Sequence, residues 1–213
     1  MIYAPPPMLH LHARTDLAWG TAALAHLPEI LHDHAHCEKK AASTAIGLVF
    51  RYPDHPGLAL PLAALAREEL EHFERVVVLL RARGGEFGRL PPSPYAAALL
   101  SACRTHEPAR AIDTLLCCAL IEARSCDRMQ ILHRALVVAR SQHHPAVDDD
   151  LVALYDDLLA CEARHHGAYV ELARTLGDRA AVDARLDELA VHEARVIAEA
   201  PVLARMHANL DGT

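Results

Sequence analysis

The chain has 213 residues and a formal net charge of −7, and alanine and leucine dominate its apolar fraction while only 4% of its residues are aromatic. This composition favours α-helices over β-strands, and no apolar run reaches the roughly 18–20 residues that a membrane-spanning helix needs. The six cysteines form no Cys-x-x-Cys pair, which argues against a cysteine-ligated zinc site or a disulfide framework and favours a reducing compartment, so we expect a cytoplasmic protein.

Apolar residues recur at spacings of three and four over four long stretches, which predicts four amphipathic helices. Glycines after the second and fourth stretches (Gly84-Gly85 and Gly177) are typical helix ends. The sequence therefore predicts an all-α four-helix bundle in one domain over residues 1–213. Its predicted elements are an extended proline-rich segment over 1–13, a short helix over 15–25, long helices over 27–51 and 58–83, a crossover over 86–106 with a short helix over 95–103, long helices over 107–140 and 148–176, and an amphipathic helix over 179–198.

The negative charge is confined to the second half of the chain. Residues 1–106 carry ten Lys and Arg against ten Asp and Glu, whereas residues 107–213 carry eleven against eighteen. A uniformly acidic protein would repel nucleic acid. Residues 75–110, however, hold six arginines against two glutamates. This local positive charge does not exclude an RNA partner, and the alternative interpretation is an ordinary solvated surface.

Each of the four long helices carries one glutamate at mid-length in its apolar stripe. Burying an unpaired carboxylate is costly, so each of these glutamates needs a compensating charge. Two of them begin a Glu-x-x-His, and a spacing of three places both side chains on one face of a helix. The glutamates are Glu38, Glu69, Glu122 and Glu162, and the two histidines are His72 and His165.

A single Glu-x-x-His is weak evidence, because a chain rich in both residues contains such pairs by chance. Glu29 and His32 form a third pair, which we interpret as incidental. The order Glu, Glu-x-x-His, Glu, Glu-x-x-His is more specific, because it is the ligand set with which four-helix bundles hold two iron or manganese ions. Carboxylate and imidazole ligands without thiolate suit either metal, and zinc stays open as an alternative. We therefore predict a two-metal site held by these six side chains.

The segments around these ligands resemble a known family, the diiron tRNA hydroxylases that act on 2-methylthio-isopentenyladenosine beside the anticodon. The resemblance covers most of the chain and rests on residues 36–42, 67–73, 121–126 and 161–166. It implies a ferritin-like four-helix bundle with additional short N-terminal and C-terminal helices. It also implies two iron ions as cofactor, held by the six predicted ligands, and dioxygen as cosubstrate.

The implied reaction inserts one oxygen atom into a terminal methyl C–H bond of the isopentenyl group. An external reductase is expected as a partner, because the sequence shows no flavin, haem or iron–sulfur motif. The tRNA is expected to present the modified adenosine splayed from its anticodon loop. We predict that it docks on the arginine-rich region between Arg75 and Arg110. The candidate contacts are Arg81, Arg83 and Arg89, with Lys39 and Lys40 as weaker candidates.

Three other functions compete with this interpretation. One is a ferritin-like ferroxidase or iron-storage protein, and another is a diiron oxidase that acts on a small molecule or lipid. The third is a non-enzymatic helical bundle whose buried carboxylates pair with arginine. The oligomeric state is open, and no membrane partner is expected.

Overall fold

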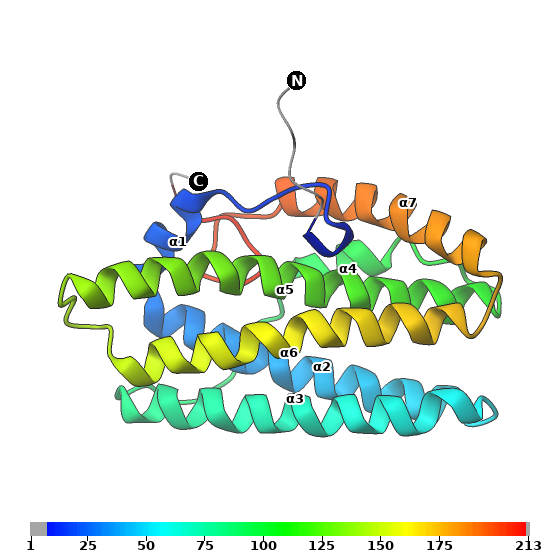
Figure 1. Cartoon of the computed structure of the whole chain (residues 1–213), viewed down its shortest axis with the longest axis horizontal. Helices are drawn as coiled ribbons and strands as arrows, with labels where there is room; N and C mark the ends of the chain where they lie inside the picture. Colours follow the sequence, from blue (N-terminus) through cyan, green and yellow to red (C-terminus); the bar gives the residue numbers. More distant parts are fainter. Residues whose placement is uncertain (1–7, 212–213) are drawn as a thin grey trace.

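The structure, a computed structural model, describes residues 8–211 and is almost entirely helical over that range (Figure 1). The predicted all-α class is confirmed, since the described residues hold no strand beyond an isolated bridge between Val202 and Asn209. Residues 1–7 of the predicted extended segment lie outside the described residues. The elements are the 3₁₀-helix η1 (Met8–His10) and the helices α1 (Leu17–Leu24), α2 (Leu27–Arg51), α3 (Pro56–Ala82), α4 (Pro94–Leu100), α5 (Ala109–Ser141), α6 (Asp149–Arg174) and α7 (Arg179–Ala198).

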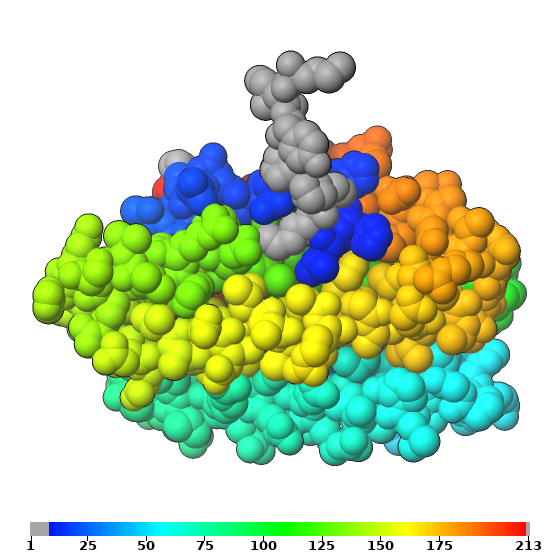
Figure 2. All heavy atoms as spheres, in the orientation of Figure 1, coloured from blue at the N-terminus to red at the C-terminus, as the bar shows by residue number. Residues whose placement is uncertain are grey.

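The four long helices form two antiparallel pairs. A short turn joins α2 to α3, another joins α5 to α6, and the pairs meet where α3 packs against α6. The predicted crossover, which contains α4, links the pairs. The shorter helices α1 and α7 lie across the outer side of α5 (Figure 1). In the face shown in Figure 2, α6 lies between α5 and α3, and their side chains form a continuous surface over the middle of the bundle.

Local side-chain contacts explain where the helix ends differ from the prediction. Helix α5 begins two residues later than predicted, because Glu107 remains outside it and accepts a hydrogen bond from the backbone N–H of Ala111. The short helix α4 ends at Leu100 rather than Cys103, because the chain then turns so that Arg104 can bind Asp113 through its backbone N–H and its guanidinium. The predicted bounds of α2 and α7 are confirmed.

The hydrophobic core is divided along the length of the bundle. One apolar cluster includes Ala45, Leu62 and Leu116 and fills the end where α5 begins. A second cluster includes Ile30 and Leu132 and fills the end where α5 stops. Between them lies a layer of buried polar side chains at mid-length, and this layer contains all six predicted metal ligands. Among the described residues, no helix combines the length and the apolarity that crossing a bilayer requires.

A second buried polar group joins α5 to the crossover and to α7. The guanidinium of Arg124 donates to both carboxylate oxygens of Glu193 at 2.8 Å and to Asp127 at 2.9 Å. Glu193 also accepts a 2.8 Å hydrogen bond from the hydroxyl of Tyr95. All four side chains are buried, so this network fixes α7 against the outer side of α5 by charge and hydrogen bonding.

Candidate metal centre

The two predicted Glu-x-x-His motifs face each other across the bundle. Ligand atoms of Glu69, His72, Glu162 and His165 all lie within 4.8 Å of one another, and all four residues are buried. Nδ1 of His72 is 3.7 Å from Oε2 of Glu69, and Nδ1 of His165 is 2.7 Å from Oε1 of Glu69. The rings of His72 and His165 stack with their centroids 5.6 Å apart. One helix from each pair, α3 and α6, thus contributes a carboxylate and an imidazole to one small volume.

The two single glutamates complete the cluster from α2 and α5. Oε2 of Glu38 lies 3.7 Å from Nδ1 of His72, and the carboxyl groups of Glu122 and Glu162 are close enough to shift each other's pKa. Glu38 is also oriented by His34, whose Nε2 lies 2.5 Å from Oε1 of the carboxylate. The other ring nitrogen of His34 lies 3.2 Å from the hydroxyl of Tyr155. All six predicted ligands therefore lie in one cluster.

Several polar atoms of the cluster have no well-formed hydrogen bond within the protein. Both carboxylate oxygens of Glu69, Oε2 of Glu162 and Nδ1 of both His72 and His165 are buried and form no hydrogen bond of acceptable geometry, although Nδ1 of His165 lies 2.7 Å from Oε1 of Glu69. Buried polar atoms are normally paired, so a group of five unpaired atoms needs a ligand. These atoms are carboxylate oxygens and imidazole nitrogens, which is the donor set of iron and manganese sites. The residues present therefore fit a metal centre.

The carboxyl groups of the cluster are buried close together, which disfavours their charged form when no cation is bound. Burial and the charge of Glu69 raise the pKa of Glu122 to about 8. Burial and the neighbouring Glu122 raise the pKa of Glu162 well above its usual range. Glu38 is the exception: burial would raise its pKa, but the contact with His34 outweighs burial and holds the pKa well below the usual range.

The same negative charge also raises the pKa values of the two histidines, which favours their protonated form. Burial by itself lowers the pKa of His72, but the nearby carboxylates of Glu38 and Glu69 outweigh burial and raise the pKa to about 10. Burial is likewise outweighed by Glu69 at His165, whose pKa rises to about 9. Without metal, protons therefore neutralise the cluster at neutral pH, and bound cations would take their place.

Metal affinity is accordingly expected to rise with pH between about pH 6 and pH 8. This window lies below the pKa values of about 8, 9 and 10 for Glu122, His165 and His72, so cations must displace protons throughout it. Each displaced proton adds about a factor of ten in affinity per pH unit. Anaerobic Fe²⁺ titration against a competing chelator at several pH values measures the slope, and calorimetry in two buffers counts the protons released. An affinity independent of pH would contradict the displacement of protons from Glu122, His165 and His72.

A cavity of about 360 Å³ adjoins the cluster. Glu38, Glu122 and Glu162 form part of its wall, so it reaches three of the six candidate ligands. Its size falls within the range of about 300–1,000 Å³ in which proteins hold small molecules. Most of the remaining wall is apolar or carries a hydroxyl. It comprises Cys37, Lys40, Ala41, Thr44, Pro92, Ser93, Tyr95, Ala96, Ala97, Leu100, Thr114, Cys118, Ile121, Ser125, Tyr169 and His207.

The residues predicted to contact substrate are spread over the molecule. Lys40 lines the cavity, whereas Lys39 contacts His36 and lies 5.2 Å from the ring centroid of Phe87. Arg81, Arg83 and Arg89 do not line it. Arg83 forms an ion pair with Asp148 at the far end of α3.

One wall of the cavity comes from a segment to which the sequence assigned no role. After α7 the chain folds back, and its backbone N–H at Met206 donates to Asp33 at 2.9 Å. His207 follows, stacked on Tyr95 with a ring separation of 4.8 Å and with Nε2 3.1 Å from the hydroxyl of Ser125. Burial lowers the pKa of His207 to about 3, so it lines the cavity as a neutral imidazole. No periodic pattern marks this segment, in which Arg205 and His207 stand among mostly apolar residues.

The buried carboxylates of the cluster have no arginine partner. The buried Arg124 binds Glu193 and Asp127 instead, on the outer side of α5. The non-enzymatic alternative required arginines beside Glu38, Glu69, Glu122 and Glu162, and the described residues provide none.

Comparisons with known proteins point in one direction. The family model described as "tRNA-(MS[2]IO[6]A)-hydroxylase (MiaE)" matches residues 3–208. A Pseudomonas putida protein named tRNA 2-(methylsulfanyl)-N(6)-isopentenyladenosine(37) hydroxylase is 43% identical over 175 residues, which cover 82% of this chain and 80% of that protein. A Salmonella typhimurium protein of the same name is 33% identical and covers 80% of this chain and 77% of its own.

A solved structure is similar as well. It is described as "Protein 43 with aldehyde deformylating oxygenase activity from Synechococcus". Its sequence is 44% identical to this chain, the TM-score is 0.82, and the match covers 93% of this chain and 95% of that one.

Proposed function

The chain belongs to the tRNA-(MS[2]IO[6]A)-hydroxylase (MiaE) family, and from that membership we propose that it is an oxygen-dependent enzyme that hydroxylates the isopentenyl group of 2-methylthio-isopentenyladenosine in tRNA. One structural observation carries the proposal to this chain. Six buried carboxylate and imidazole side chains converge at mid-bundle, and three of them form the wall of a largely apolar cavity. A ferritin-like bundle of this kind combines a metal site with a place for an aliphatic substrate.

We propose that Glu38, Glu69, His72, Glu122, Glu162 and His165 hold two iron ions. Reduced iron would supply the capacity to activate dioxygen towards an aliphatic C–H bond, which protein side chains lack. In the overall reaction one oxygen atom enters the C–H bond and the other leaves as water, so two electrons and two protons are consumed. We infer that an external reductase provides the electrons, and that the reaction takes place in the cytoplasm with the tRNA.

The side chains around the site would orient the ligands and exclude water. His34 lies between Tyr155 and Glu38, so it fixes the direction in which that carboxylate faces the cluster. The walls contributed by Ala97 and Ile121 offer apolar contact to an isopentenyl group. The base would enter the cavity after leaving the stacked anticodon loop, as base-modifying enzymes require.

The proposed activity is tested with iron-loaded protein, dioxygen, a chemical or enzymatic reductant and tRNA that bears 2-methylthio-isopentenyladenosine. Mass spectrometry of the digested tRNA is expected to show the hydroxylated nucleoside, and its new oxygen is expected to carry the label when ¹⁸O₂ is used. Matched controls are tRNA without the isopentenyl group and an anaerobic reaction. Absence of product from protein with a full iron content would contradict the proposal.

A second candidate function follows from the solved relative described as having aldehyde deformylating oxygenase activity. The cavity is mostly apolar, so an aliphatic aldehyde is the corresponding substrate class. The same iron-loaded protein can be given a long-chain aldehyde and assayed for formate. Formate release without tRNA hydroxylation would favour this alternative over the tRNA reaction.

A further inference from the structure

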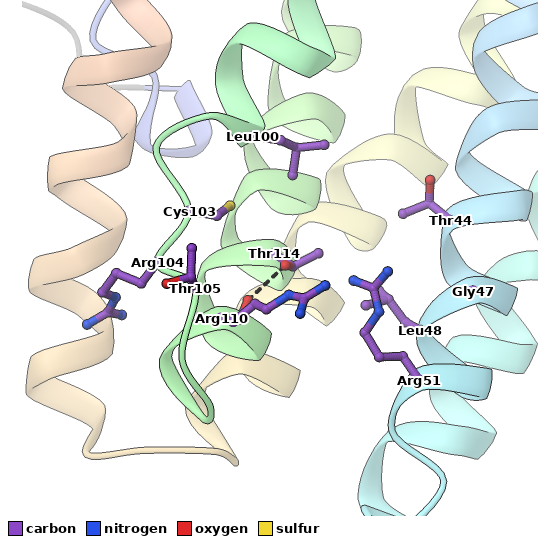
Figure 3. Close-up of a pocket in the computed structure, with 10 residues that line it drawn as sticks. All are labelled: Thr44, Gly47, Leu48, Arg51, Leu100, Cys103, Arg104, Thr105, Arg110 and Thr114. Carbon is purple, nitrogen blue, oxygen red and sulfur yellow. Dashed lines mark hydrogen bonds between the residues drawn. The ribbon is translucent and has the colours of Figure 1, made fainter.

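A second hollow lies beside the cavity, nearer the end of the bundle where α2 stops, and Figure 3 shows the residues that line it. Its volume is about 530 Å³, and it lies between the last two turns of α2 on one side and the start of α5 with the segment after α4 on the other. Thr44, Leu100 and Thr114 line both spaces. The outer hollow, which we call the arginine basin, is therefore adjacent to the inner cavity beside the metal ligands, with these three side chains between them.

Two arginines from opposite walls converge in this basin. Figure 3 shows that the guanidinium groups of Arg51 on α2 and Arg110 on α5 point towards one another across the hollow. Both residues are exposed, and neither guanidinium has a carboxylate within ion-pair distance in the described part of the chain. Arg104, the third arginine of the lining, points away from the hollow and binds Asp113.

The acidic side chains near the arginine basin already have partners within the protein. Asp113 binds both Arg104 and Arg185, and Glu107 accepts hydrogen bonds from the hydroxyl of Tyr52 and from the backbone N–H of Ala111. Two like charges that face each other without a counter-ion repel, and an anion between them relieves the repulsion. Some surface arginines, such as Arg140 beside Asp149, have a carboxylate partner, and others are single. Arg51 and Arg110 differ from both kinds because two unpaired guanidinium groups face each other across one hollow. The basin is thus arranged to take an external anion.

We propose that Arg51 and Arg110 bind the phosphate groups that flank the modified adenosine while its base occupies the inner cavity; this rests on the proposed function. A base that leaves the stack remains bonded to its ribose, so its own flanking phosphates must lie at the entrance of the cavity that holds it. The guanidinium is the side chain best suited to phosphate, because its donors match the phosphate oxygens in pairs. The positive charge of the basin suits the phosphates of the nucleotide. The largely apolar wall of the inner cavity suits the isopentenyl group at its other end.

The proposal places the RNA strand away from the arginines that sequence proximity suggested. Arg83 lies beside Asp148, where α6 begins, whereas Arg110 is in the first turn of α5. Helix α5 has 33 residues, so about 50 Å separates its two ends. The two arginine groups therefore make different predictions about which variants weaken RNA binding.

Binding of an anticodon stem-loop that carries the modified adenosine tests the proposal, with fluorescence anisotropy measured on the iron-loaded full chain over a range of salt concentrations. Each lost phosphate contact reduces the slope of log affinity against log salt by about 0.7–0.9. The double variant Arg51→Ala/Arg110→Ala is expected to lose about 1.4–1.8 from the slope and at least tenfold in affinity at low salt. Arg51→Lys/Arg110→Lys retains both charges and is expected to keep most of the slope.

Two other double variants complete the experiment. Arg67→Ala/Arg134→Ala removes the same charge from exposed positions outside the basin and is expected to leave the slope unchanged. Arg81→Ala/Arg89→Ala tests the docking region suggested by the sequence. A wild-type slope in Arg51→Ala/Arg110→Ala, or an equal loss in the Arg67/Arg134 control, overturns the proposal. Iron content and helical circular dichroism check that each variant is folded.

The binding measurement does not depend on whether product forms, so the two proposals can fail separately. If wild-type protein binds the stem-loop through Arg51 and Arg110 but never hydroxylates it, the proposed function fails and the basin stands. If tRNA is hydroxylated and Arg51→Ala/Arg110→Ala leaves KM unchanged, the basin fails alone. The supporting result is a raised KM for tRNA with kcat largely retained, because the basin does not touch the candidate metal ligands.

Discussion

Glu69→Ala is expected to abolish hydroxylation and to prevent stoichiometric iron binding while leaving the helical content intact. Both carboxylate oxygens of Glu69 are buried and form no hydrogen bond of acceptable geometry, although Nδ1 atoms of His72 and His165 lie 3.7 and 2.7 Å from them. The side chain is therefore central to the cluster, and no neighbouring residue can replace its charge. Glu162→Ala, on the facing helix, is expected to act in the same way.

Iron content by elemental analysis and product formation are measured on the same samples. Glu71→Ala is the matched control, because Glu71 is on the same helix but exposed to solvent. Glu69 carries the charge that faces the imidazoles of His72 and His165, so metal-free Glu69→Ala is expected to be less stable than metal-free wild type. Helical circular dichroism therefore checks that the variant remains folded. Retained activity with two bound irons would overturn the assignment of Glu69 as a ligand.

Arg124→Ala is expected to cost about 3–5 kcal/mol in the free energy of unfolding. The substitution leaves the carboxylates of Glu193 and Asp127 buried after losing the guanidinium that donates to both, at distances of 2.8 and 2.9 Å. Isolated buried charge is among the most destabilising changes a single substitution can make. Chemical denaturation of metal-free protein measures the effect without interference from metal binding.

The comparison for Arg124 is Arg140→Ala, which breaks a solvent-exposed ion pair with Asp149. Exposed pairs contribute little to stability because solvent screens them, so Arg140→Ala should be far less destabilising than Arg124→Ala. Adding Glu193→Gln to Arg124→Ala removes one of the uncompensated charges and should recover part of the lost stability. A cost below about 1 kcal/mol for Arg124→Ala would mean that water reaches this network.

Much of the fold could be predicted from the sequence, because its apolar residues recur with the period of a helix. The bounds of α2 and α7 follow from their apolar spacing and their flanking residues. The cluster follows as well, because a carboxylate in the middle of an apolar stripe must face inward, and four such helices of similar length meet at one level. The structure accordingly brings Glu38 and Glu122 to the same layer as the two Glu-x-x-His motifs.

Contacts between distant, non-periodic segments could not be predicted in this way. The partner of Arg124 is 69 positions away on α7, and His207 reaches the cavity from a segment without helical spacing. His34 joins Tyr155, 121 positions away, to Glu38, and helical spacing does not show that contact. The six arginines counted over residues 75–110 come from opposite ends of the bundle. The crossover in this range runs from one end to the other, and sequence proximity does not show that course.

The polar layer that divides the hydrophobic core has a consequence for how the fold is held together. In chain order the candidate ligands run from Glu38 to His165, and they come from all four long helices. The six cysteines are all free thiols, so none of them links these helices covalently. Two bound cations would act as cross-links between distant parts of the chain, with coordination bonds in the place that disulfides take in secreted domains. The metal centre would then stabilise the fold of the bundle as well as support the reaction. Protein without iron would be both less stable and inactive.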